Sequence, residues 1–509
     1  MKKVLSFPLL CLISLSLAFV SCTPPLARSP NPTAAIEASV TSLATEKIET
    51  SILLSPTPTA TVFAPTIVPS PTYTAASAQG PWLVGASLLS GQDKSVLFLA
   101  DVADRGLSHT PLGSAKAKIT SNGLALSPDG SMIAVRWHTG DNDYGLSIYS
   151  IPNLVLVMEI SLIGNEASNL LASLEDQRPP IKNALDAAPG SILWSPNSRY
   201  LAFVGAMDTD STDVYVFDTT KNEVRHLTSG ATQSYLLAWS PDSQWIIHAS
   251  YDDVGIGIGI KAIWAVSASK GTISFLYSAE PYVMDVNILG WLNEQTFLAQ
   301  SKFFEACAGD VKEVSISSGV TATILSARNS GADFDPVNRR MLFVKQPGEN
   351  YCGSSEPGIY SIDPKSGNIS VVVQGDYYWF YYIPELGAFT TRDSASDAMK
   401  VITSGGRIIL DLPGATEILP SPSGKLISVE YPDHLAIYSN EGSLIAQVRP
   451  IVCGSLRWLP NDEGIVIFPC SNLSTQWDIY LASAGWEKTA TMQIPFRTSP
   501  DDFLLIGLK

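Results

Sequence analysis

The chain has 509 residues and a formal net charge of -16, because 48 acidic residues outnumber 32 lysines and arginines. This balance argues against a nucleic-acid surface, which needs clustered positive charge. Hydrophobic residues make up 45% of the chain and charged residues 16%, so the composition also excludes a largely disordered protein.

The N-terminus has the pattern of an export signal. Lys2 and Lys3 precede a short apolar run from Val4 to Val20. The segment Phe19-Val20-Ser21-Cys22 resembles the lipobox of bacterial lipoproteins, with Phe19 where that family prefers Leu. The resemblance implies that residues 1–21 are a signal peptide and that Cys22 carries a lipid. We therefore expect an extracytoplasmic, membrane-anchored lipoprotein at the cell surface or in the periplasm; an uncleaved anchor helix and ordinary secretion are the alternatives.

Residues 22–80 are rich in Pro, Thr, Ser and Ala, as in Ser55-Pro56-Thr57-Pro58-Thr59. Such a composition does not bury a core, so we expect a disordered linker. As a flexible coil it would span about 40–50 Å. It is either a stalk that holds the following domain away from the membrane or a spacer without a further role, and the sequence does not separate the two.

Residues 81–509 are predicted to form one β domain built from a recurring turn. In the best copies Ser, Pro and Asp occupy the first three turn positions, and a following Gly tolerates positive φ. The cleanest copy is Ser127-Pro128-Asp129-Gly130. The close copies start at Ser195, Ser240, Ser421 and Ser499, and the weaker ones at Leu292, Asp335, Ile383 and Leu459.

The copies recur with a period of about 40–45 residues, which is typical of four-stranded propeller blades. A β-sandwich is the alternative, but it does not need the same turn so often. The motifs Trp194 to Asn197 and Trp239 to Asp242 resemble those of TolB-like and WD-repeat-like propellers. This resemblance implies an all-β fold with a single β-propeller of about eight four-stranded blades, seven to nine being allowed.

The two ends of the domain are predicted to share one blade. Trp82 to Leu89, Ser95 to Val102 and Leu107 to Leu112 are three expected strands without a preceding inner one. The segment Phe503 to Gly507 follows the last turn and would complete that blade. Closure of the ring removes exposed strand edges.

By the convention of the propeller family, the Ser-Pro-Asp turns lie on one face. The loops between second and third strands, and those between blades, open on the opposite face, which we call the loop face. One insertion there predicts a helix that begins at Asn165, with Ala167, Leu170, Leu171 and Leu174 at helical spacing. It is either a lid or docking helix or an insertion packed on the rim.

Four cysteines remain after Cys22, namely Cys307, Cys352, Cys453 and Cys470. All four are expected on the loop face. Four cysteines allow three pairings, and their places in neighbouring or shared blades favour Cys307–Cys352 and Cys453–Cys470. An exported protein can keep such disulfides. A metal site is the alternative, but no CxxC or CxxH spacing supports it.

Aspartates gather in two expected loops of the loop face. They are Asp141 and Asp143 in the first loop and Asp208, Asp210 and Asp213 in the second, and Asp252 and Asp253 follow Tyr251 in a third place. Spaced carboxylates suit calcium, a cation that prefers oxygen ligands. Neither cluster has the full EF-hand pattern, and the common role of Asp in solvated turns is the alternative.

The sequence carries no nucleophile elbow, zinc-protease motif, phosphate loop or dinucleotide fingerprint. The run Tyr377 to Tyr382 is either a carbohydrate-stacking platform or an inner strand whose rings fill the wedge between blades. We expect a monomeric, non-catalytic binding module for a protein or glycan at the cell envelope, without a cofactor apart from calcium. The alternative function is a glycan lyase or hydrolase with its active site in the central funnel.

Overall fold

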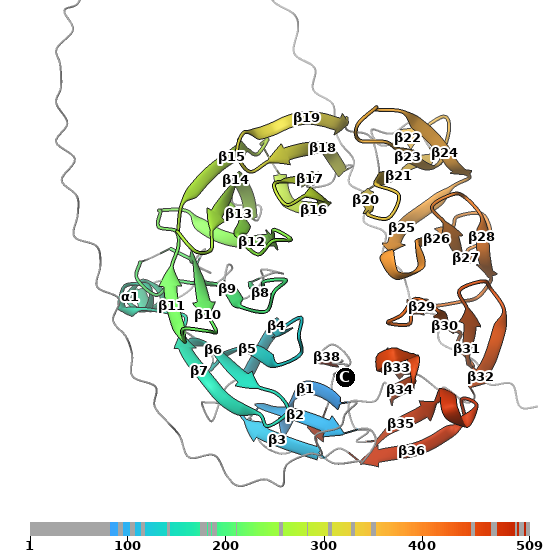
Figure 1. Ribbon diagram of the computed structural model, residues 1–509, viewed down its shortest axis with the longest axis horizontal. Coiled ribbons are helices and arrows are strands. Elements are labelled where there is room, and N and C mark those ends of the chain that lie inside the picture. The colour runs from blue at the N-terminus through green and yellow to red at the C-terminus, as the bar shows by residue number, and fades with distance from the viewer. Residues whose placement is uncertain are drawn as a thin grey trace, which may run out of the picture. The chain divides into compact units, whose positions relative to one another are not determined.

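The computed structural model describes residues 82–89, 95–101, 107–112, 118–139, 143–173, 181, 185, 191–209, 211–253, 258–281, 283–303, 308–326, 331–347, 353–448, 454–469, 476–493, 496–497 and 503–504. Within these residues the chain forms nine antiparallel β-sheets, which follow one another around a ring (Figure 1). The fold is a β-propeller, as the resemblance implied. Its nine blades lie within the expected range of seven to nine and number one more than the eight favoured by the repeat count.

The blades are named here in chain order, and each is given from its innermost to its outermost strand. Blade 1 has β1 (Trp82–Leu89), β2 (Ser95–Asp101) and β3 (Leu107–Pro111), with β37 (Phe496–Arg497) and β38 (Phe503–Leu504) paired to β1. Blade 2 has β4 (Lys118–Leu126), β5 (Met132–His138), β6 (Tyr144–Ser150) and β7 (Val155–Ser161). Blade 3 has β8 (Ile192–Trp194), β9 (Tyr200–Gly205), β10 (Asp213–Asp218) and β11 (Glu223–His226).

Blade 4 has β12 (Gln233–Trp239), β13 (Trp245–Asp253), β14 (Ile258–Ser267) and β15 (Ile273–Ser278). Blade 5 has β16 (Val283–Asn293), β17 (Thr296–Phe303), β18 (Ala308–Ser315) and β19 (Gly319–Leu325). Blade 6 has β20 (Ala332–Asp335), β21 (Arg340–Pro347), β23 (Gly358–Ile362) and β24 (Ile369–Gln374), with β22 (Gly353–Ser354) paired to β21.

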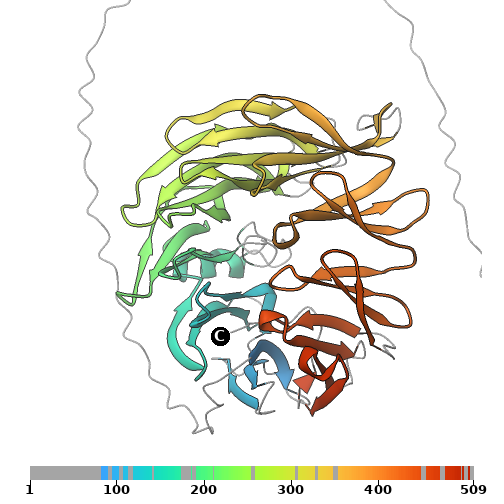
Figure 2. The same ribbon diagram turned by 45° about the vertical axis from the view of Figure 1, so that its right-hand side comes forward.

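Blade 7 has β25 (Tyr377–Ile383), β26 (Ala388–Asp393), β27 (Met399–Thr403) and β28 (Ile408–Leu412). Blade 8 has β29 (Glu417–Pro420), β30 (Leu426–Glu430), β31 (Leu435–Ser439) and β32 (Leu444–Val448). Blade 9 has β33 (Gly454–Trp458), β34 (Gly464–Pro469), β35 (Gln476–Leu481) and β36 (Lys488–Gln493). The turned view shows the strands of Blades 7 and 8 as separate twisted sheets (Figure 2).

The repeated turn has the local chemistry that its sequence predicts. In four copies the serine Oγ accepts a hydrogen bond from the main-chain N–H five residues later, at 2.9 to 3.1 Å. The fourth turn residue takes a left-handed conformation, with φ of 71° at Gly130 and 59° at Ser198. These serines are buried, so each hydroxyl satisfies main-chain groups that water does not reach.

The hydrophobic core lies between the blades. Eight clusters of buried side chains each join two consecutive blades, from Blades 1 and 2 to Blades 8 and 9. The rings of Phe98 and Trp477 join Blade 1 to Blade 9, with their centroids 5.8 Å apart. Each blade therefore depends on its neighbours for burial, which explains why the repeats form one domain.

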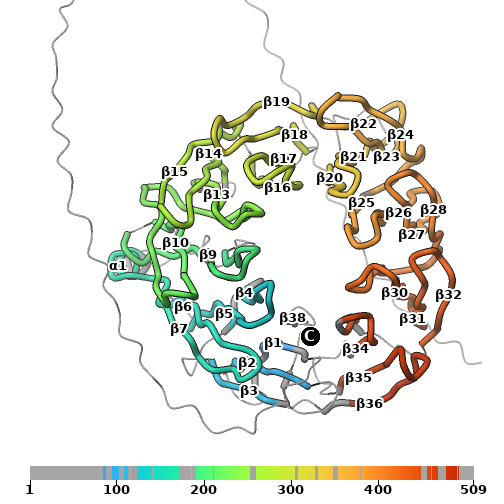
Figure 3. Tube along the Cα trace, viewed as in Figure 1, coloured from blue at the N-terminus to red at the C-terminus, as the bar shows by residue number. Residues whose placement is uncertain are grey.

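The ring is closed as the sequence predicts. Strand β1 pairs with β38 through Val84 and Leu504, and with β37 through Leu89 and Phe496. The chain trace passes once around the ring, so that its blue and red ends lie side by side (Figure 3). The first and last parts of the domain are thus held together in Blade 1.

The predicted insertion helix is present as α1 (Asn165–Ser173), between Blades 2 and 3. Ala167 is buried in the cluster that joins these blades, and Leu170 packs against it. Three single-turn 3-10 helices complete the described elements, namely η1 (Pro384–Leu386), η2 (Pro460–Asp462) and η3 (Ala482–Ala484). Among the described residues, no helix combines the length and the apolar character that crossing a membrane requires.

Candidate functional site

An indole hydrogen bond closes three of the junctions between blades. In each case the tryptophan that ends an inner strand donates from Nε1 to a main-chain oxygen in the inner strand of the preceding blade. The three bridges join Trp194 to Ala125 (3.0 Å), Trp239 to Leu193 (2.9 Å) and Trp458 to Leu419 (3.2 Å). The large ring thus fills the junction and also satisfies a carbonyl group.

Blades 5, 6 and 7 depart from this pattern, as do Blades 2 and 8, where Leu126 and Pro420 precede the turn. In Blades 5, 6 and 7 the position before the turn is occupied by Trp291, Phe334 and Tyr382. Within the described part of the chain, the Trp291 indole has no hydrogen-bond partner, and Phe334 has no polar atom in its ring. The Tyr382 hydroxyl turns to a different acceptor, Asp335 Oδ1, at 2.7 Å. These junctions therefore lack the indole bridge, and two of the three rings are smaller than indole.

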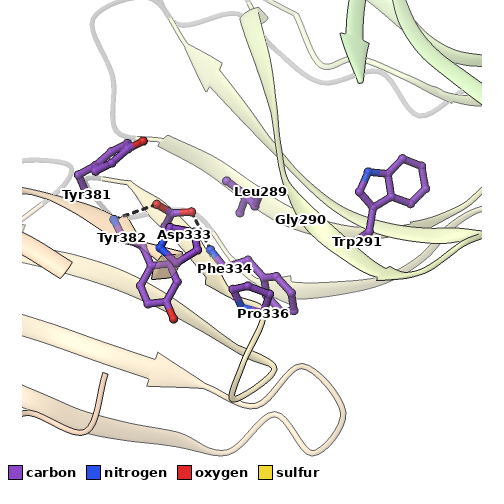
Figure 4. A pocket seen from close by; sticks show the side chains of 9 residues that line it. Leu289, Gly290, Trp291, Asp333, Phe334, Pro336, Tyr381 and Tyr382 are labelled. Carbon is purple, nitrogen blue, oxygen red and sulfur yellow. Dashed lines mark hydrogen bonds between the residues drawn. The ribbon is translucent and has the colours of Figure 1, made fainter. Parts of the chain in front are cut away.

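A cavity of about 430 Å³ opens along the inner strands of these three blades (Figure 4). Its lining comes from β16, β20 and β25 and from the turns that follow β20 and β25. The lining residues are Leu289, Gly290, Trp291, Asp333, Phe334, Pro336, Tyr381, Tyr382 and Pro384. The surface is mainly aromatic and aliphatic, and Asp333 is the charged residue among these nine.

The absence of a side chain at Gly290 allows Phe334 to form the wall of the cavity. A Cβ atom at residue 290 would lie 2.4 Å from Phe334 Cδ1, closer than atoms pack. Phe334 therefore lies directly against the main chain of β16, on the other side of the blade junction. Any larger residue at position 290 would displace the ring and change the shape of the cavity.

The Asp333 carboxylate is held by two main-chain donors. Phe334 N–H donates to Oδ1 at 2.8 Å, and Tyr382 N–H donates to Oδ2 at 3.2 Å. Figure 4 shows both bonds at the side of the cavity formed by Tyr382. Burial nevertheless raises the pKa of Asp333 above its usual value, despite these two bonds. No ion pair joins Asp333 to another described residue, so its charge has no cationic neighbour there.

Tyr382 connects the cavity to the neighbouring turn through Asp335. That carboxylate also accepts hydrogen bonds from the main-chain N–H groups of Val337 and Asn338, both at 3.0 Å. Burial favours a higher pKa for Asp335, but the bonds from Asn338 and Tyr382 hold its pKa below the usual value. The hydrogen bonds of Asp335 thus outweigh its burial, whereas the two hydrogen bonds of Asp333 do not.

Exposed aromatic side chains occur on β25, the strand that contributes Tyr381 to the cavity. Tyr381 is 64% exposed and Tyr378, on the same strand, is 54% exposed, although most tyrosines of the domain are well buried. Val337 in the turn next to Pro336 is 70% exposed. Exposed apolar side chains at the mouth of a cavity are typical of a binding surface.

A second hollow of similar volume, about 430 Å³, lies beside β32, β35 and β36 in Blades 8 and 9. Its lining includes Trp486 and Tyr480, but Lys488 pairs there with Asp478 at 2.7 Å. The remaining carboxylate of this hollow, Glu487, is exposed to solvent. The cavity at Asp333 is the stronger candidate for a ligand because its carboxylate is half-buried and has no ion-pair partner in the described residues.

Two carboxylates face each other on Blade 8. Glu417 on the inner strand β29 is directly opposite Glu430 on β30, a register that brings Cβ atoms to within about 5 Å. Burial, with a smaller contribution from Glu417, raises the pKa of Glu430 above its usual value. The two carboxyl groups thus lie side by side on the sheet of Blade 8.

The structure places two of the predicted calcium ligands around a histidine. Asp208 Oδ2 lies 3.2 Å from His226 Nδ1, and Asp213 Oδ2 lies 3.4 Å from His226 Nε2. The imidazole stacks on Tyr215, with the ring centroids 4.5 Å apart. This grouping on Blade 3 is a network of aspartate and histidine that the sequence did not indicate.

Asp143 lies apart from that grouping, in the loop between β5 and β6, where its carboxylate accepts a hydrogen bond from Thr139 Oγ1 at 3.1 Å. Asp141 and Asp210 lie outside the described residues. Among the residues that are described, no group of three or more histidine, cysteine or acidic side chains has an arrangement suited to a metal ion. The calcium hypothesis therefore stays a prediction.

Other predicted sites also fall where the structure gives no description. Cys307, Cys352, Cys453 and Cys470 lie outside the described residues, as do Cys22, the expected signal peptide and the linker. The two disulfides and the lipid anchor remain predictions.

The aromatic run from Tyr377 to Tyr382 is part of the inner strand β25, as one of the two sequence interpretations holds. The same strand also lines the cavity through Tyr381 and Tyr382, so this inner strand contributes aromatic side chains to a candidate binding surface. Sequence reasoning searched the loop face for binding residues and did not find this site near the turns. A partial signal was present, because three of the four weak turn copies, at Leu292, Asp335 and Ile383, mark the blades that form the cavity.

No family model and no curated protein matches this sequence. Among solved structures, that of the eukaryotic initiation factor is similar with a TM-score of 0.51 and 11% identity, over 82% of this chain and 97% of that one. The structure of AztD from Citrobacter koseri is similar with a TM-score of 0.41 and 12% identity, over 82% of this chain and 96% of that one. For TolB from Acinetobacter baumannii the TM-score is 0.27 and the identity 12%, over 65% of this chain and 63% of that one. At these identities the likeness extends to the propeller fold alone.

Proposed function

We propose that this protein is an exported, lipid-anchored β-propeller that acts as a non-catalytic binding module at the cell envelope. The observation that carries the proposal is the cavity on Blades 5, 6 and 7. It opens where smaller or unbridged rings replace the tryptophan that closes other junctions. Its lining of aromatic and aliphatic side chains around one carboxylate is suited to holding a ligand.

The proposed location at the cell envelope is inferred from the sequence. The charged N-terminal residues, the apolar run and the small residue before Cys22 together support export and lipidation. The Pro-rich linker would then separate the propeller from the membrane. Replacement of Cys22 by Ala should move the protein from the membrane fraction to the soluble fraction, and membrane retention of that variant would refute the anchor.

The binding role is tested by closing the cavity. Phe334→Trp restores the residue found at closed junctions and adds volume directly at the wall. The full-length protein and this variant are purified from membranes after cross-linking, together with Val155→Trp, which adds the same ring on the exposed outer strand β7. We expect one dominant partner with the native protein and with Val155→Trp, and its loss with Phe334→Trp. An identical partner set in all three preparations would refute the cavity as the binding site.

The carboxylate pair Glu417 and Glu430 favours a second candidate function, a glycan lyase or hydrolase. Two neighbouring carboxyl groups, with the pKa of Glu430 raised by burial, are the kind of pair that general acid and base catalysis uses. The measurement is the release of new chain ends from a panel of glycans. Activity that disappears in Glu430→Gln and persists in Phe334→Trp would favour this enzyme over the binding module.

A further inference from the structure

The chemistry of the cavity at Asp333 narrows the class of its ligand. The carboxylate uses one oxygen for each of two main-chain N–H groups, and no described side chain brings a positive charge to it. A half-buried carboxylate without a cation is unfavourable, because main-chain dipoles compensate a full charge only in part. A cationic ligand would supply the missing charge at this place.

Aromatic rings in the lining favour the same kind of ligand. Phe334 and Tyr381 line the cavity together with the carboxylate, from two different strands, whereas the Trp291 ring packs on Phe297 with the centroids 5.1 Å apart. The face of an aromatic ring attracts a cation, most strongly where water is excluded. Aliphatic Leu289 and the two prolines of the lining suit the methylene stem of a long basic side chain. An anionic ligand would instead be repelled by Asp333.

Resting on the binding role proposed above, we propose that the cavity takes a lysine or arginine side chain presented by a basic segment of a partner protein. The opening of the cavity supports a protein partner. Tyr381 lines the cavity and is 64% exposed, and the exposed Val337 follows the lining residue Pro336. The net charge of -16 also favours the approach of a basic partner.

Asp285 offers a matched control for the carboxylate. It lies on the inner strand β16, four residues before the lining residue Leu289, but pairs with Lys302 at 3.6 Å and accepts a hydrogen bond from Tyr235 at 3.4 Å. Asp333→Asn and Asp285→Asn therefore remove the same charge from neighbouring inner strands. Only the first removes it from the cavity.

The test measures binding of oligolysine and oligoarginine peptides to the purified full-length protein, by titration calorimetry and by tryptophan fluorescence. An acetylated oligolysine peptide is the uncharged control, and N-acetyl-lysine methylamide is the small-molecule arm. We expect the basic peptides to bind the native protein. Asp333→Asn and Tyr381→Ala should each weaken binding by about tenfold or more, and Asp285→Asn by less than about twofold.

Several results would overturn the proposal. Equal effects of Asp333→Asn and Asp285→Asn would show that the peptides respond to the net charge and not to the cavity. Equal binding of the acetylated peptide would exclude a cationic ligand. Binding of the small amine as tight as that of the peptides would replace the protein partner by a free organic cation. Circular dichroism and thermal unfolding identify a variant that fails to fold. If Asp333→Asn fails to fold, peptide binding by Tyr381→Ala, which changes an exposed residue, tests the proposal instead.

The failure of this inference is distinguishable from failure of the binding role. Loss of the envelope partner in Phe334→Trp but not in Asp333→Asn would retain the cavity as a binding site and reject the cationic ligand. Retention of that partner in both variants would reject the binding role itself. Loss in both, without loss in Asp285→Asn, is the result expected here.

Discussion

The main-chain N–H of Asp129 donates a hydrogen bond of 3.0 Å to Ser198 Oγ, across the junction between Blades 2 and 3. The same relationship recurs one blade further, where Asn197 N–H donates to Ser243 Oγ at 3.1 Å. In both cases the serine at the fourth position of one turn accepts a hydrogen bond from the main-chain N–H of the third residue of the preceding turn. Repeated turns therefore form a chain of contacts between blades, beyond closing their own hairpins.

Substitution of Ser198 should separate this contact from the backbone requirement of the turn. Ser198 has a left-handed φ of 59°, a conformation that Gly adopts more easily than Ala. Ser198→Ala loses the acceptor and keeps the strain, so we expect a loss of about 1 kcal/mol in the free energy of unfolding. Ser198→Gly should be less destabilising. Urea unfolding measures both variants, and a larger loss in the Gly variant would contradict this account.

Replacement of Trp239 by Phe should weaken the junction between Blades 3 and 4. The change removes the indole N–H from Leu193 O and leaves a void in a buried cluster. We expect a loss of about 1–3 kcal/mol in the free energy of unfolding. Trp264→Phe is the control, because the Trp264 indole bonds Ser250 within its own blade and is less buried. Equal losses in both variants would show that the bridge between blades has no special weight.

Buried His248 should make stability fall at mildly acidic pH. Burial lowers the pKa of His248 to about 4. Between the usual pKa of about 6.5 and about 4, the unfolded chain takes up a proton that the folded protein does not, so stability decreases as pH falls through this range. His248→Gln should flatten the dependence of the urea midpoint on pH between about 7 and about 5. A similar flattening in His434→Gln would assign the effect to histidine number alone.

Removal of the closing strands should open the ring. A chain that lacks residues 494–509 loses β37 and β38 and leaves the inner edge of β1 unpaired. Exposed strand edges associate with other chains, so we expect a lower unfolding temperature and larger species in size-exclusion chromatography. A chain that lacks only residues 505–509 keeps both strands and is the control. A monomeric first variant with native stability would contradict the role of closure.

Local features of this protein were predictable because they depend on neighbouring residues. The turn at Ser127 needs a buried hydroxyl, a residue with fixed φ and a Gly, all within a few positions. The helix at Asn165 and the alternating apolar strands follow from the same short-range rules. Their recurrence at blade-like spacing then indicates a ring, and the missing inner strand before Trp82 indicates how the ring closes.

The cavity was not predictable in this way. Gly290, Asp333 and Tyr382 come from three blades, and their packing depends on how ring size at one junction matches the main chain of the next. Likewise, His226 meets Asp208 and Asp213 only because β11 returns beside β10.

The sequence alone therefore determined the repeat, its turns and the closure of one ring, since these follow from hydrogen bonding and hydrophobic spacing along the chain. The tertiary structure alone decided the ninth blade and the place where a ligand can enter. A cavity exists where the side chains of adjoining blades fail to fill their junction, and the packing of distant residues determines that volume.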